Sequence, residues 1–570
     1  MAETLISPGV LARENDSSFI RQQPVNVGAA IIGPTVLGPV EIPTVVTSYS
    51  DYVNKFGAGF QSGSDNVSFF TSIAAYNYFN NGGTSLLVAR VVSASNTWTP
   101  ATCTSILNNV ESGVLTTGSA LSNISTNSTA SVSGTTGSLA TGSYIYSGTA
   151  GAGAVFSIVK TSGSLVTSIT ATTAGTGYNI GDTFTFQSAS IGTVGNVVAT
   201  LAATDIVNST TPAFVLKTLS EGIIMNSSSS MDVSGSLASG SADNIRYQIT
   251  NADTASGTFS LLIRQGNDNT NNPIVLETWT GLSLDPFAAN FVSKVLGDQN
   301  QNYNSTNNQI EVSGSYFNAS RYVRVSAVNT PTPYYFDNTG IAKPQYTSSI
   351  PVNASGSFTG GVGQVAAGAN FYETINGTNT QGLVGADYNN MIDLLANQDE
   401  YKFNILFAPG LYNSGYTSQC TSMINNTQTR GDSLFVLDLV PYNTTISTVT
   451  TQANSRNTSY AASYWPWVQM IDPATGKNVW VPASTVMAGV FAFNDTVAEP
   501  WFAPAGINRG GLQVIRAEQK LPQTSRDTLY TNKVNPIATF PGTGTVVYGQ
   551  KTLQTKASAL DRVNVRRLLI

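Results

Sequence analysis

The sequence predicts a multidomain protein of the α+β class, and three observations lead to this prediction. Strand and helix patterns alternate over residues 25–92 and again over residues 371–500. Between them, residues 98–350 are dominated by Ser, Thr, Gly and Asn with scattered Val, Ile and Phe, which is typical of β structure. The length of 570 residues is enough for about four domains.

The first part of the chain predicts an extended arm followed by short strands. Residues 1–22 place charged and small polar residues around one apolar run, which is too little hydrophobic mass for a core. The apolar runs at 27–32 and 40–46 are predicted strands, because Gly and Pro end the first and interrupt the second. Asn66 is the predicted N-cap of a helix, and residues 85–92 are a predicted buried strand.

The middle of the chain contains two patterns that predict paired strands. Residues 169–186 are punctuated by glycine-containing turns and predict a hairpin. Residues 245–264 alternate between apolar and polar side chains, which predicts a second pair of strands. No fixed repeat period is visible, which argues against a solenoid.

The C-terminal part predicts parallel strands with helices between them. Residues 403–407 are a predicted strand closed by Pro409 and Gly410, residues 417–428 a polar helix, and residues 433–440 a second buried strand. This strand–helix–strand order is typical of parallel pairing in an α/β sheet.

Further elements are predicted on both sides of this unit. Asp387 and Ser484 each begin a predicted helix, and residues 464–470 and 479–481 are predicted to be extended.

The composition excludes several kinds of catalytic and metal site. The chain has no histidine, so a Ser-His-Asp relay, a Cys-His pair and an imidazole-ligated zinc or haem are ruled out. Its two cysteines, Cys103 and Cys420, are too far apart in the sequence for a Cys-x-x-Cys metal site, and we expect both to be buried apolar residues. We therefore expect no catalytic residues, no cofactor and no metal.

The surface is predicted to be polar but weakly charged. Charged residues make up 10% of the chain, against about 25% in an ordinary domain. Neutral hydroxyls and amides suit permanent contacts, because burying an unpaired charge is costly. The net charge of −6 and the lack of Lys/Arg clusters argue against nucleic acid as the partner. The N-terminus has no secretory signal pattern and no apolar run approaches about 18 residues, so we expect folding in a cytoplasm and no membrane insertion.

Several short motifs follow one another along the chain. In the first 92 residues they are Ser7-Pro8-Gly9-Val10, Gly28-Ala29-Ala30-Ile31-Ile32-Gly33-Pro34, Phe79-Asn80-Asn81-Gly82-Gly83 and Val88-Ala89-Arg90-Val91. Later they are Ala408-Pro409-Gly410, Leu437-Asp438, Trp465-Pro466-Trp467-Val468, Val481-Pro482-Ala483-Ser484, Trp501-Phe502-Ala503-Pro504-Ala505-Gly506 and Leu560-Asp561-Arg562-Val563-Asn564-Val565-Arg566-Arg567-Leu568. In this order they resemble the tail sheath protein of contractile-tailed bacteriophages of the myovirus type. The resemblance covers about residues 7–92 and 360–570.

The resemblance implies a mechanical function. Proteins of this family are structural subunits, not enzymes, that polymerise as stacked hexameric rings around the tail tube. Their contraction drives the tube through the host envelope for genome ejection. The implied partners are other copies of the chain in a helical assembly, the tail tube protein, the baseplate and the tail terminator. The implied location is the virion, after assembly in the host cytoplasm.

The resemblance also implies a discontinuous α/β core, formed by N- and C-terminal segments, with a large β-rich central insertion and extended arms at both ends. The implied parts are an N-terminal linking arm at 1–22, a first core segment at 23–97, an outward insertion at 98–355 that is either one domain or two divided near residue 205, an α/β core at 356–530 and a C-terminal linking segment at 531–570. Family members usually continue beyond this point, so we expect the chain to be truncated after Ile570 or completed by another polypeptide.

We expect the two ends of the chain to link neighbouring copies by pairing as strands with them. The residues expected to do so are Pro8, Gly9, Val10, Leu11 and Arg13 near the start and Arg562, Val563, Asn564, Val565, Arg566 and Arg567 near the end. Residues 551–570 carry five basic residues, beginning with Lys551, against one acidic residue. A basic end on an acidic body favours head-to-tail contact between copies.

Other patterns are better explained by structure than by binding. The patterns weighed in this way are Gly361-Val362-Gly363 (a turn, not a dinucleotide site), Arg430-Gly431-Asp432 (a turn, not an adhesion motif), Asn179 with Asp182 (a turn, not a Ca²⁺ loop), and Trp465-Pro466-Trp467 with Trp501-Phe502 (packing, not a ligand platform).

Two other functions stay open on the residues alone. Any two of the 32 acidic residues can meet in a fold, so a hydrolase with paired carboxylates is one alternative. A β-rich phage receptor-binding spike or capsule depolymerase is the other, and it suits the middle of the chain. It does not explain the α/β pattern at residues 371–500.

Overall fold

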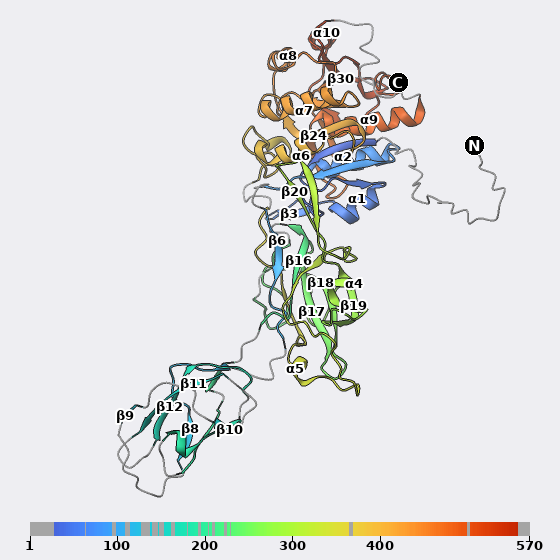
Figure 1. Ribbon diagram of the computed structural model, residues 1–570. Helices are drawn as coiled ribbons and strands as arrows, with labels where there is room; N and C mark the ends of the chain where they lie inside the picture. The colour runs from blue at the N-terminus through green and yellow to red at the C-terminus, as the bar shows by residue number, and fades with distance from the viewer. Residues whose placement is uncertain are drawn as a thin grey trace, which may run out of the picture. The chain divides into compact units, whose positions relative to one another are not determined.

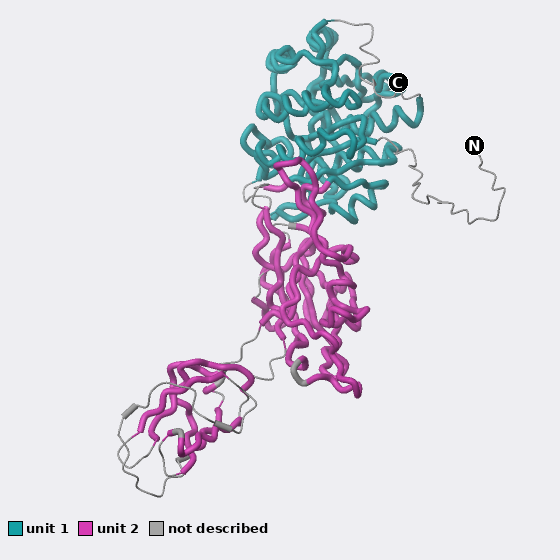
Figure 2. Tube along the Cα trace, viewed as in Figure 1, with its two compact units in different colours: residues 1–35, 43–91, 368–570 teal, residues 36–42, 92–367 magenta. Residues whose placement is uncertain are grey.

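The structure is a computed structural model of the chain. The residues it describes are 28–62, 64–93, 98–108, 114–126, 137–138, 146–147, 153–160, 166–178, 181–191, 195–202, 204–207, 211–221, 225–227, 230–363, 369–498 and 502–556. They mix helices and strands, which confirms the predicted mixture of α and β structure. The chain forms two compact units (Figure 2). Unit 1 comprises residues 1–35, 43–91 and 368–570, and unit 2 comprises residues 36–42 and 92–367.

Unit 1 is built on an eight-stranded sheet (Figure 1). In spatial order its strands are β2 (Thr44–Val46), β5 (Leu86–Arg90), β1 (Gly28–Gly33), β24 (Phe403–Tyr412), β25 (Leu434–Asp438), β26 (Ala461–Trp465), β30 (Val534–Phe540) and β31 (Gly544–Val547). The strands from β5 to β30 are parallel, and β2 and β31 are antiparallel to their neighbours. Because β1 lies between β5 and β24, segments from both ends of the chain share one sheet.

Helices cover this sheet. They are α1 (Tyr49–Phe56), α2 (Phe70–Asn80), α6 (Asn389–Leu394), α7 (Thr417–Arg430), α8 (Ile446–Asn454), α9 (Ala483–Val497) and α10 (Gln523–Thr531). Helix α9 is buried on almost every side because it packs against α2 and against β24, β25 and β26. Smaller strands of unit 1 are β3 (Phe60–Ser62), β4 (Asp65–Val67), β27 (Val468–Ile471), β28 (Asn478–Val481) and β29 (Arg516–Ala517).

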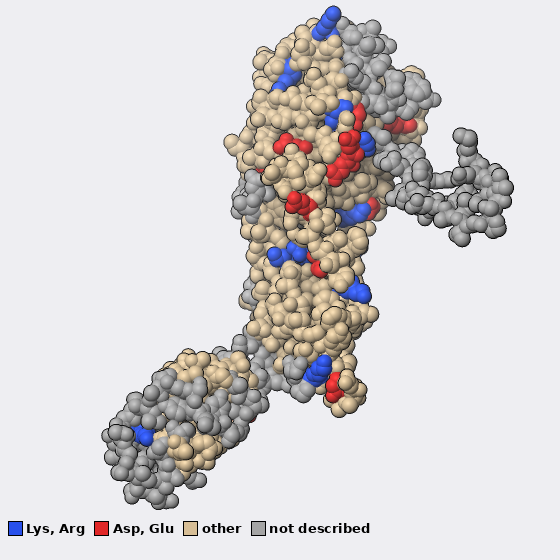
Figure 3. All heavy atoms as spheres, in the orientation of Figure 1, with Lys and Arg blue, Asp and Glu red and all other residues tan. Residues whose placement is uncertain are grey.

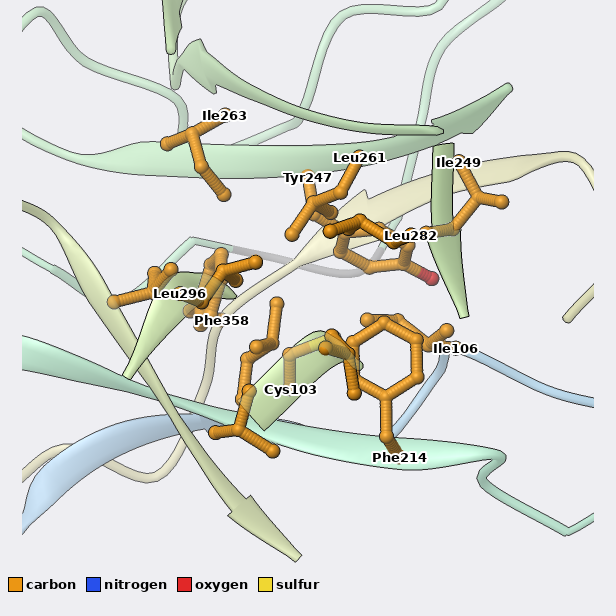
Figure 4. Close-up of a cluster of buried hydrophobic side chains, with 14 of the residues drawn as sticks. Cys103, Ile106, Phe214, Tyr247, Ile249, Leu261, Ile263, Leu282, Leu296 and Phe358 are labelled. Carbon is orange, nitrogen blue, oxygen red and sulfur yellow. The ribbon is translucent and has the colours of Figure 1, made fainter. Parts of the chain in front are cut away.

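Unit 2 is made of antiparallel sheets around two separate hydrophobic clusters. The elements around the first cluster are β6 (Pro100–Cys103), β16 (Phe214–Glu221), β17 (Ile245–Asp253), β18 (Thr258–Gln265), β19 (Val275–Ser283), α4 (Val292–Leu296), β22 (Val323–Val328) and β23 (Ala354–Ser357). Figure 4 shows part of this cluster, with Phe214 and Tyr247 among the largest side chains.

The second cluster is formed within residues 115–201. The elements of this stretch are β8 (Asn123–Thr126), β10 (Tyr146–Ser147), β11 (Val155–Lys160), β12 (Val166–Thr173), β13 (Thr183–Phe186) and β14 (Val197–Thr200). Phe156, Phe184 and Phe186 meet there in edge-to-face and stacked contacts.

Two predicted pairings are confirmed and one is wrong. Strands β24 and β25 are parallel with α7 between them, and β17 pairs with β18. The hairpin predicted at 169–186 does not form, because β12 pairs with β11 while β13 pairs with β14. Strand β24 also continues beyond Pro409. The regular pairing of β24 with β25 is interrupted between Phe407 and Tyr412, where a residue without an N–H is tolerated.

The predicted N-cap at Asn66 is also wrong. Asn66 lies in β4, and α2 begins at Phe70. The main-chain N–H of Phe70 donates instead to Oε1 of Gln381, 2.7 Å away. A residue more than 300 positions later therefore supplies the cap, which no local pattern reveals.

Candidate functional sites on the central sheet

The residues predicted to link neighbouring copies lie outside the described residues. They are Pro8, Gly9, Val10, Leu11 and Arg13 near the start and Arg562, Val563, Asn564, Val565, Arg566 and Arg567 near the end. The candidate sites within the described residues lie at the carboxyl ends of the parallel strands of unit 1 and at the two edge strands of its sheet.

The first site is the crevice between β1 and β24, where the strand order reverses. Open α/β sheets bind ligands at such a switch point, often at a helix N-terminus. Here Gln381 caps the N-terminus of α2, and the hydroxyl of Thr380 donates to the carbonyl of Gly410 at 3.0 Å. Both side chains are buried. Gly410 has φ +98°, and a Cβ there would meet Thr380 Oγ1 at 2.7 Å. The protein itself fills this crevice.

The second site is the carboxyl group of Asp438 at the end of β25. It is buried, and it accepts hydrogen bonds from the hydroxyl of Ser484 at 2.6 Å and from the N–H of Ser484 at 3.1 Å. Burial raises the pKa of Asp438 to about 7, and the two hydrogen bonds partly oppose this rise. The carboxyl therefore joins β25 to the first turn of α9, and both of its oxygens are engaged.

A buried amide beside Asp438 joins β25 to α8 and to the segment that follows α8. The N–H of Asn413 donates to the carbonyl of Asp438 at 2.9 Å, and its Nδ2 donates to Gln452 in α8 at 2.8 Å. Nε of Arg456 donates to Oδ1 of Asn413 at 2.8 Å. Buried polar groups that are fully paired hold a unique packing arrangement. This cluster braces the carboxyl end of the sheet.

The third site is the edge of the sheet at β31. Val547 N–H donates to the carbonyl of Gly510 at 2.7 Å, and Leu512 N–H donates to the carbonyl of Thr545 at 2.9 Å. A loop of the same chain therefore covers the edge with backbone hydrogen bonds. An exposed strand edge attracts other strands, so covering it prevents uncontrolled pairing.

A pocket of about 580 Å³ opens between this edge and α10. The residues that line it are Ala505, Gly506, Gln523, Arg526, Asp527, Tyr530, Pro536, Tyr548, Gly549 and Gln550. The guanidinium of Arg526 lies 5.1 Å from the ring centre of Phe540 and 6.0 Å from that of Tyr548. We call this the α10 pocket. Asn535, which precedes the lining residue Pro536, exchanges two hydrogen bonds of 2.7 Å between its side chain and the backbone of Lys551.

The opposite edge of the sheet, at β2, is short and blocked. Nζ of Lys55 donates to the carbonyl of Val45 at 3.1 Å and to Asp51 at the same distance. A lysine at a strand edge is a common protection against edge-to-edge pairing. Asp51 also receives the N–H of Thr47, and its own N–H is capped by Ser48. The Ser48-x-x-Asp51 spacing is typical of a helix start and could have predicted α1, a helix that was not predicted from the sequence.

Two of the motifs that were predicted to serve structure instead of ligand binding do have structural roles. Arg430 ends α7, and its guanidinium donates to both oxygens of Asp432 at 2.9 Å and to the carbonyl of Leu395 at 2.8 Å. Trp465 and Trp467 are buried, as expected for packing residues.

The two cysteines are buried as predicted. Burial raises the pKa of the Cys103 thiol to about 11 and that of the Cys420 thiol to about 12, so neither is a reactive thiolate at neutral pH. Asn179 and Trp501 lie outside the described residues.

One of the basic residues near the C-terminal end is held by a contact within the chain. Nζ of Lys551 lies 4.1 Å from the ring centre of Tyr530 and donates to its carbonyl at 3.0 Å, so this cation is engaged within the chain. On the face drawn in Figure 3, charged side chains are scattered and most of the surface is neutral. In the part of the chain that the structure describes, no helix is long and apolar enough to cross a bilayer, and no group of three acidic or cysteine side chains converges as a metal site would require.

Comparison with known proteins gives consistent names. The family model described as the phage tail sheath protein central domain matches residues 382–553. The tail sheath protein of Vibrio phage KVP40 is 42% identical over 113 residues, which is 20% of this chain and 17% of that protein. The tail sheath protein of Enterobacteria phage T4 is 37% identical over 132 residues, 23% of this chain and 20% of that protein. A solved sheath tail protein from Listeria innocua is 10% identical, covers 95% of this chain and 75% of that one, and has a TM-score of 0.43.

The chain thus spans about a fifth of the length of the curated relatives it matches. The family model covers helices α6 to α10 and the strands from β24 to β31, a region that includes Asn413, Asp438 and the α10 pocket. The resemblance to phage tail sheath proteins is therefore confirmed, and residues 382–553 match the family model of the central domain of those proteins.

Proposed function

We propose that the chain is a structural subunit of a contractile phage tail sheath. In this proposal copies polymerise as stacked hexameric rings around a tail tube, and the stack contracts to drive the tube through the host envelope. The partners are other copies, the tube protein, the baseplate and the tail terminator, and the location is the virion. The match of residues 382–553 to the tail sheath central domain carries the proposal.

The proposal assigns a separate task to each part of the chain. The α/β core of unit 1 is the rigid body of the subunit, the β-rich unit 2 is its outward insertion, and the two ends are linking arms. The braces around Asp438 and Asn413 support the role of a rigid body, because they tie strands and helices together through buried hydrogen bonds.

The proposal includes no enzymatic activity. It is supported by the way the chain occupies its own α/β crevice with Thr380 and Gln381, and by the engagement of both Asp438 oxygens with Ser484. A hydrolase would need an acid that is free to meet a substrate.

The arms would hold copies together while the bodies move. A shared strand of five residues makes about four or five backbone hydrogen bonds, each with a net value of about 1 kcal/mol. Each joint would therefore be worth several kcal/mol and survive a rearrangement of the bodies. If contraction favoured the final arrangement by only about 2 kcal/mol per copy, coupling over many copies would make it irreversible.

We place the acceptor for an incoming arm at the α10 pocket and the adjoining β31 edge. The pocket offers hydroxyl, amide and aromatic groups beside strand backbone. The β31 edge is already paired with the loop at residues 510–512, so an incoming arm would displace this loop or pair with its outer side. The edge at β2 is less suitable because Lys55 blocks it.

Deletion of residues 1–22 tests the linking role. We expect folded, soluble subunits that form no tubes in electron micrographs, whereas tubes of normal length would overturn the linking proposal. Gln523→Trp, which fills the α10 pocket, should have the same effect. Thr524→Trp is the matched control, because Thr524 is exposed on the same helix and does not line the pocket.

A further inference from the structure

Two aromatic side chains on loops of unit 2 are exposed and stacked on each other. Phe287 follows β19 and Tyr334 follows β22. Their ring centres are 4.5 Å apart and the ring planes differ by 12°. The exposed fractions are 65% for Phe287 and 63% for Tyr334. Exposed aromatic surface of this kind marks interaction sites more often than single exposed residues do.

The two loops are fixed to each other and to the body of unit 2. The N–H of Thr332 donates to the carbonyl of Leu284 at 3.0 Å, which joins the loops. Tyr335, directly after Tyr334, is buried, and its hydroxyl donates to the carbonyl of Thr254 at 2.6 Å. The rings are therefore held in place before any partner binds, which lowers the entropic cost of binding.

The backbone at Tyr334 supports this view. Its φ is +52°, in the left-handed region that a bulky residue rarely adopts. Such a conformation is unfavourable for a bulky residue and persists only where the surroundings enforce it, frequently at binding sites. Pro286 precedes Phe287 and Pro333 precedes Tyr334, so each ring follows a residue with a fixed φ.

The size of the exposed pair points to a small ligand. An aromatic side chain offers about 150–250 Å², so two rings that are two-thirds exposed present roughly 200–300 Å². A stable protein interface needs about 800 Å² on each partner. Phe336 and Ile341 are exposed on the same loop and add to this apolar surface, which still falls short of that area. The ring pair itself matches the apolar face of one sugar ring in size.

The groups around the rings point to a neutral ligand. The loops at residues 284–291 and 329–341 contain no Lys or Arg, which an anionic polymer would require. Oδ1 of Asp285 accepts the N–H of Phe287, which leaves Oδ2 to accept a hydroxyl. The hydroxyl of Tyr334 lies at the edge of the stacked pair and can donate or accept.

We propose that Phe287 and Tyr334 form a binding site for a neutral hexose of a surface polysaccharide. The C–H face of the sugar packs on the exposed ring face, and its hydroxyls bond to Asp285 and to the Tyr334 hydroxyl. One such site binds weakly. In a polymer of many copies the sites act together, and avidity exceeds the single-site affinity by about 10²–10⁴; this last step rests on the proposed function.

The test measures sugar binding by the full chain. Saturation-transfer NMR with the methyl glycosides of glucose, galactose and mannose should give signals from at least one sugar. Retention on immobilised dextran, galactan and mannan is compared with retention on anionic alginate. Phe287→Ala and Tyr334→Ala should each reduce binding at least fivefold, and Tyr334→Phe should reduce it less. Phe317→Ala, which removes another exposed ring of unit 2, should change nothing.

Leucine variants keep the apolar volume without a ring face. Phe287→Leu and Tyr334→Leu therefore test the stacking if an alanine variant fails to fold. The proposal is overturned if the wild-type chain binds none of the neutral sugars, if alginate binds better, or if Phe317→Ala loses as much binding. It is also overturned if the ring variants leave sugar binding intact and abolish self-association, because the pair is then an interface between copies. If the ring variants lose sugar binding but still form normal tubes, sugar binding and the sheath function are separate properties of the chain.

Discussion

Unit 1 and unit 2 build their hydrophobic cores with different kinds of strand pairing. In unit 1 a parallel sheet pairs Gly28 with Phe403, so strands from distant parts of the sequence must meet before the core exists. In unit 2 the antiparallel pairs β17–β18 and β18–β19 join neighbours in the sequence, although β16 also pairs with the distant strands β6 and β22. Parallel pairing over long separations is slow to form, whereas antiparallel pairing between neighbouring strands forms more readily. The sheet of unit 1 therefore depends on segments that lie far apart in the sequence.

The two units also treat buried charge differently. In unit 1 the carboxyl of Asp438 meets only neutral donors from Ser484. In unit 2 the carboxylate of Asp268 meets Arg264 at 2.7 Å and Arg246 at 3.3 Å, and all three side chains are buried. The first arrangement is a buried carboxyl group with neutral partners and the second is a buried ion pair, so they respond to different perturbations.

The largest expected effect comes from removing the first core strands. A chain that begins at residue 92 lacks β1, β2 and β5, so the sheet of unit 1 loses its strands on one side of β24. The same truncation removes residues 36–42, a small part of unit 2. We expect unit 1 to lose its fold completely while unit 2 keeps most of its structure. Hydrogen exchange should show unprotected amides in β24–β26 and protected amides in β17 and β18.

A matched deletion sharpens the same comparison. Replacing residues 114–207 by a short linker removes the second hydrophobic cluster only. Protection in β24–β26 and in β17 and β18 should then be unchanged. Loss of protection in the sheet of unit 1 would contradict the independence of the two units.

The next largest effect is expected at the buried ion pair of unit 2. Asp268→Ala leaves two buried guanidinium groups without their counter-charge, and breaking such a pair costs about 3–5 kcal/mol. The urea concentration at which the amides of β17 and β18 lose half of their protection from hydrogen exchange should fall accordingly. The corresponding concentration for β24 should not change. An unchanged midpoint would show that water or another acceptor replaces the carboxylate.

A smaller, pH-dependent effect is expected at Asp438. Its folded pKa is raised to about 7, whereas the unfolded value is about 3.9. Between these values the folded chain holds one more proton, so its stability falls as the pH rises through that window, by at most about 1.4 kcal/mol per unit, and then levels off. Asp438→Asn should flatten the difference in urea midpoint between pH 5 and pH 8. Equal slopes for the two proteins would contradict the raised pKa.

The smallest effect is expected at the ion pair that ends α7. Asp432 is about one-third exposed in its pair with Arg430, so solvent screens the attraction. Asp432→Ala should lower the stability of unit 1 by no more than about 1 kcal/mol, measured by thermal unfolding. A loss as large as that of Asp268→Ala would mean that exposure does not explain the difference between the two pairs.

Local patterns predicted the elements of this protein better than they predicted its pairing. The strand–helix–strand segment at 403–440 and the strands at 245–264 follow from periodicity, because their partners are neighbours in the sequence. The partner exchange of β12 and β13 does not, because alternation identifies a strand and not its neighbour. The hydrogen bonds by which Thr380 and Gln381 fill the crevice between β1 and β24 were not predicted for the same reason. Their partners, Gly410 and Phe70, are distant in the sequence.

Imaging of assembled protein tests the central claim most directly. A cryo-EM map of particles formed by the full chain should show tubes of stacked rings, with residues 1–22 of each copy lying as a strand against a neighbouring copy beside its β31 edge. Trimeric spikes, or tubes in which both ends of every copy lie free in solvent, would contradict the account.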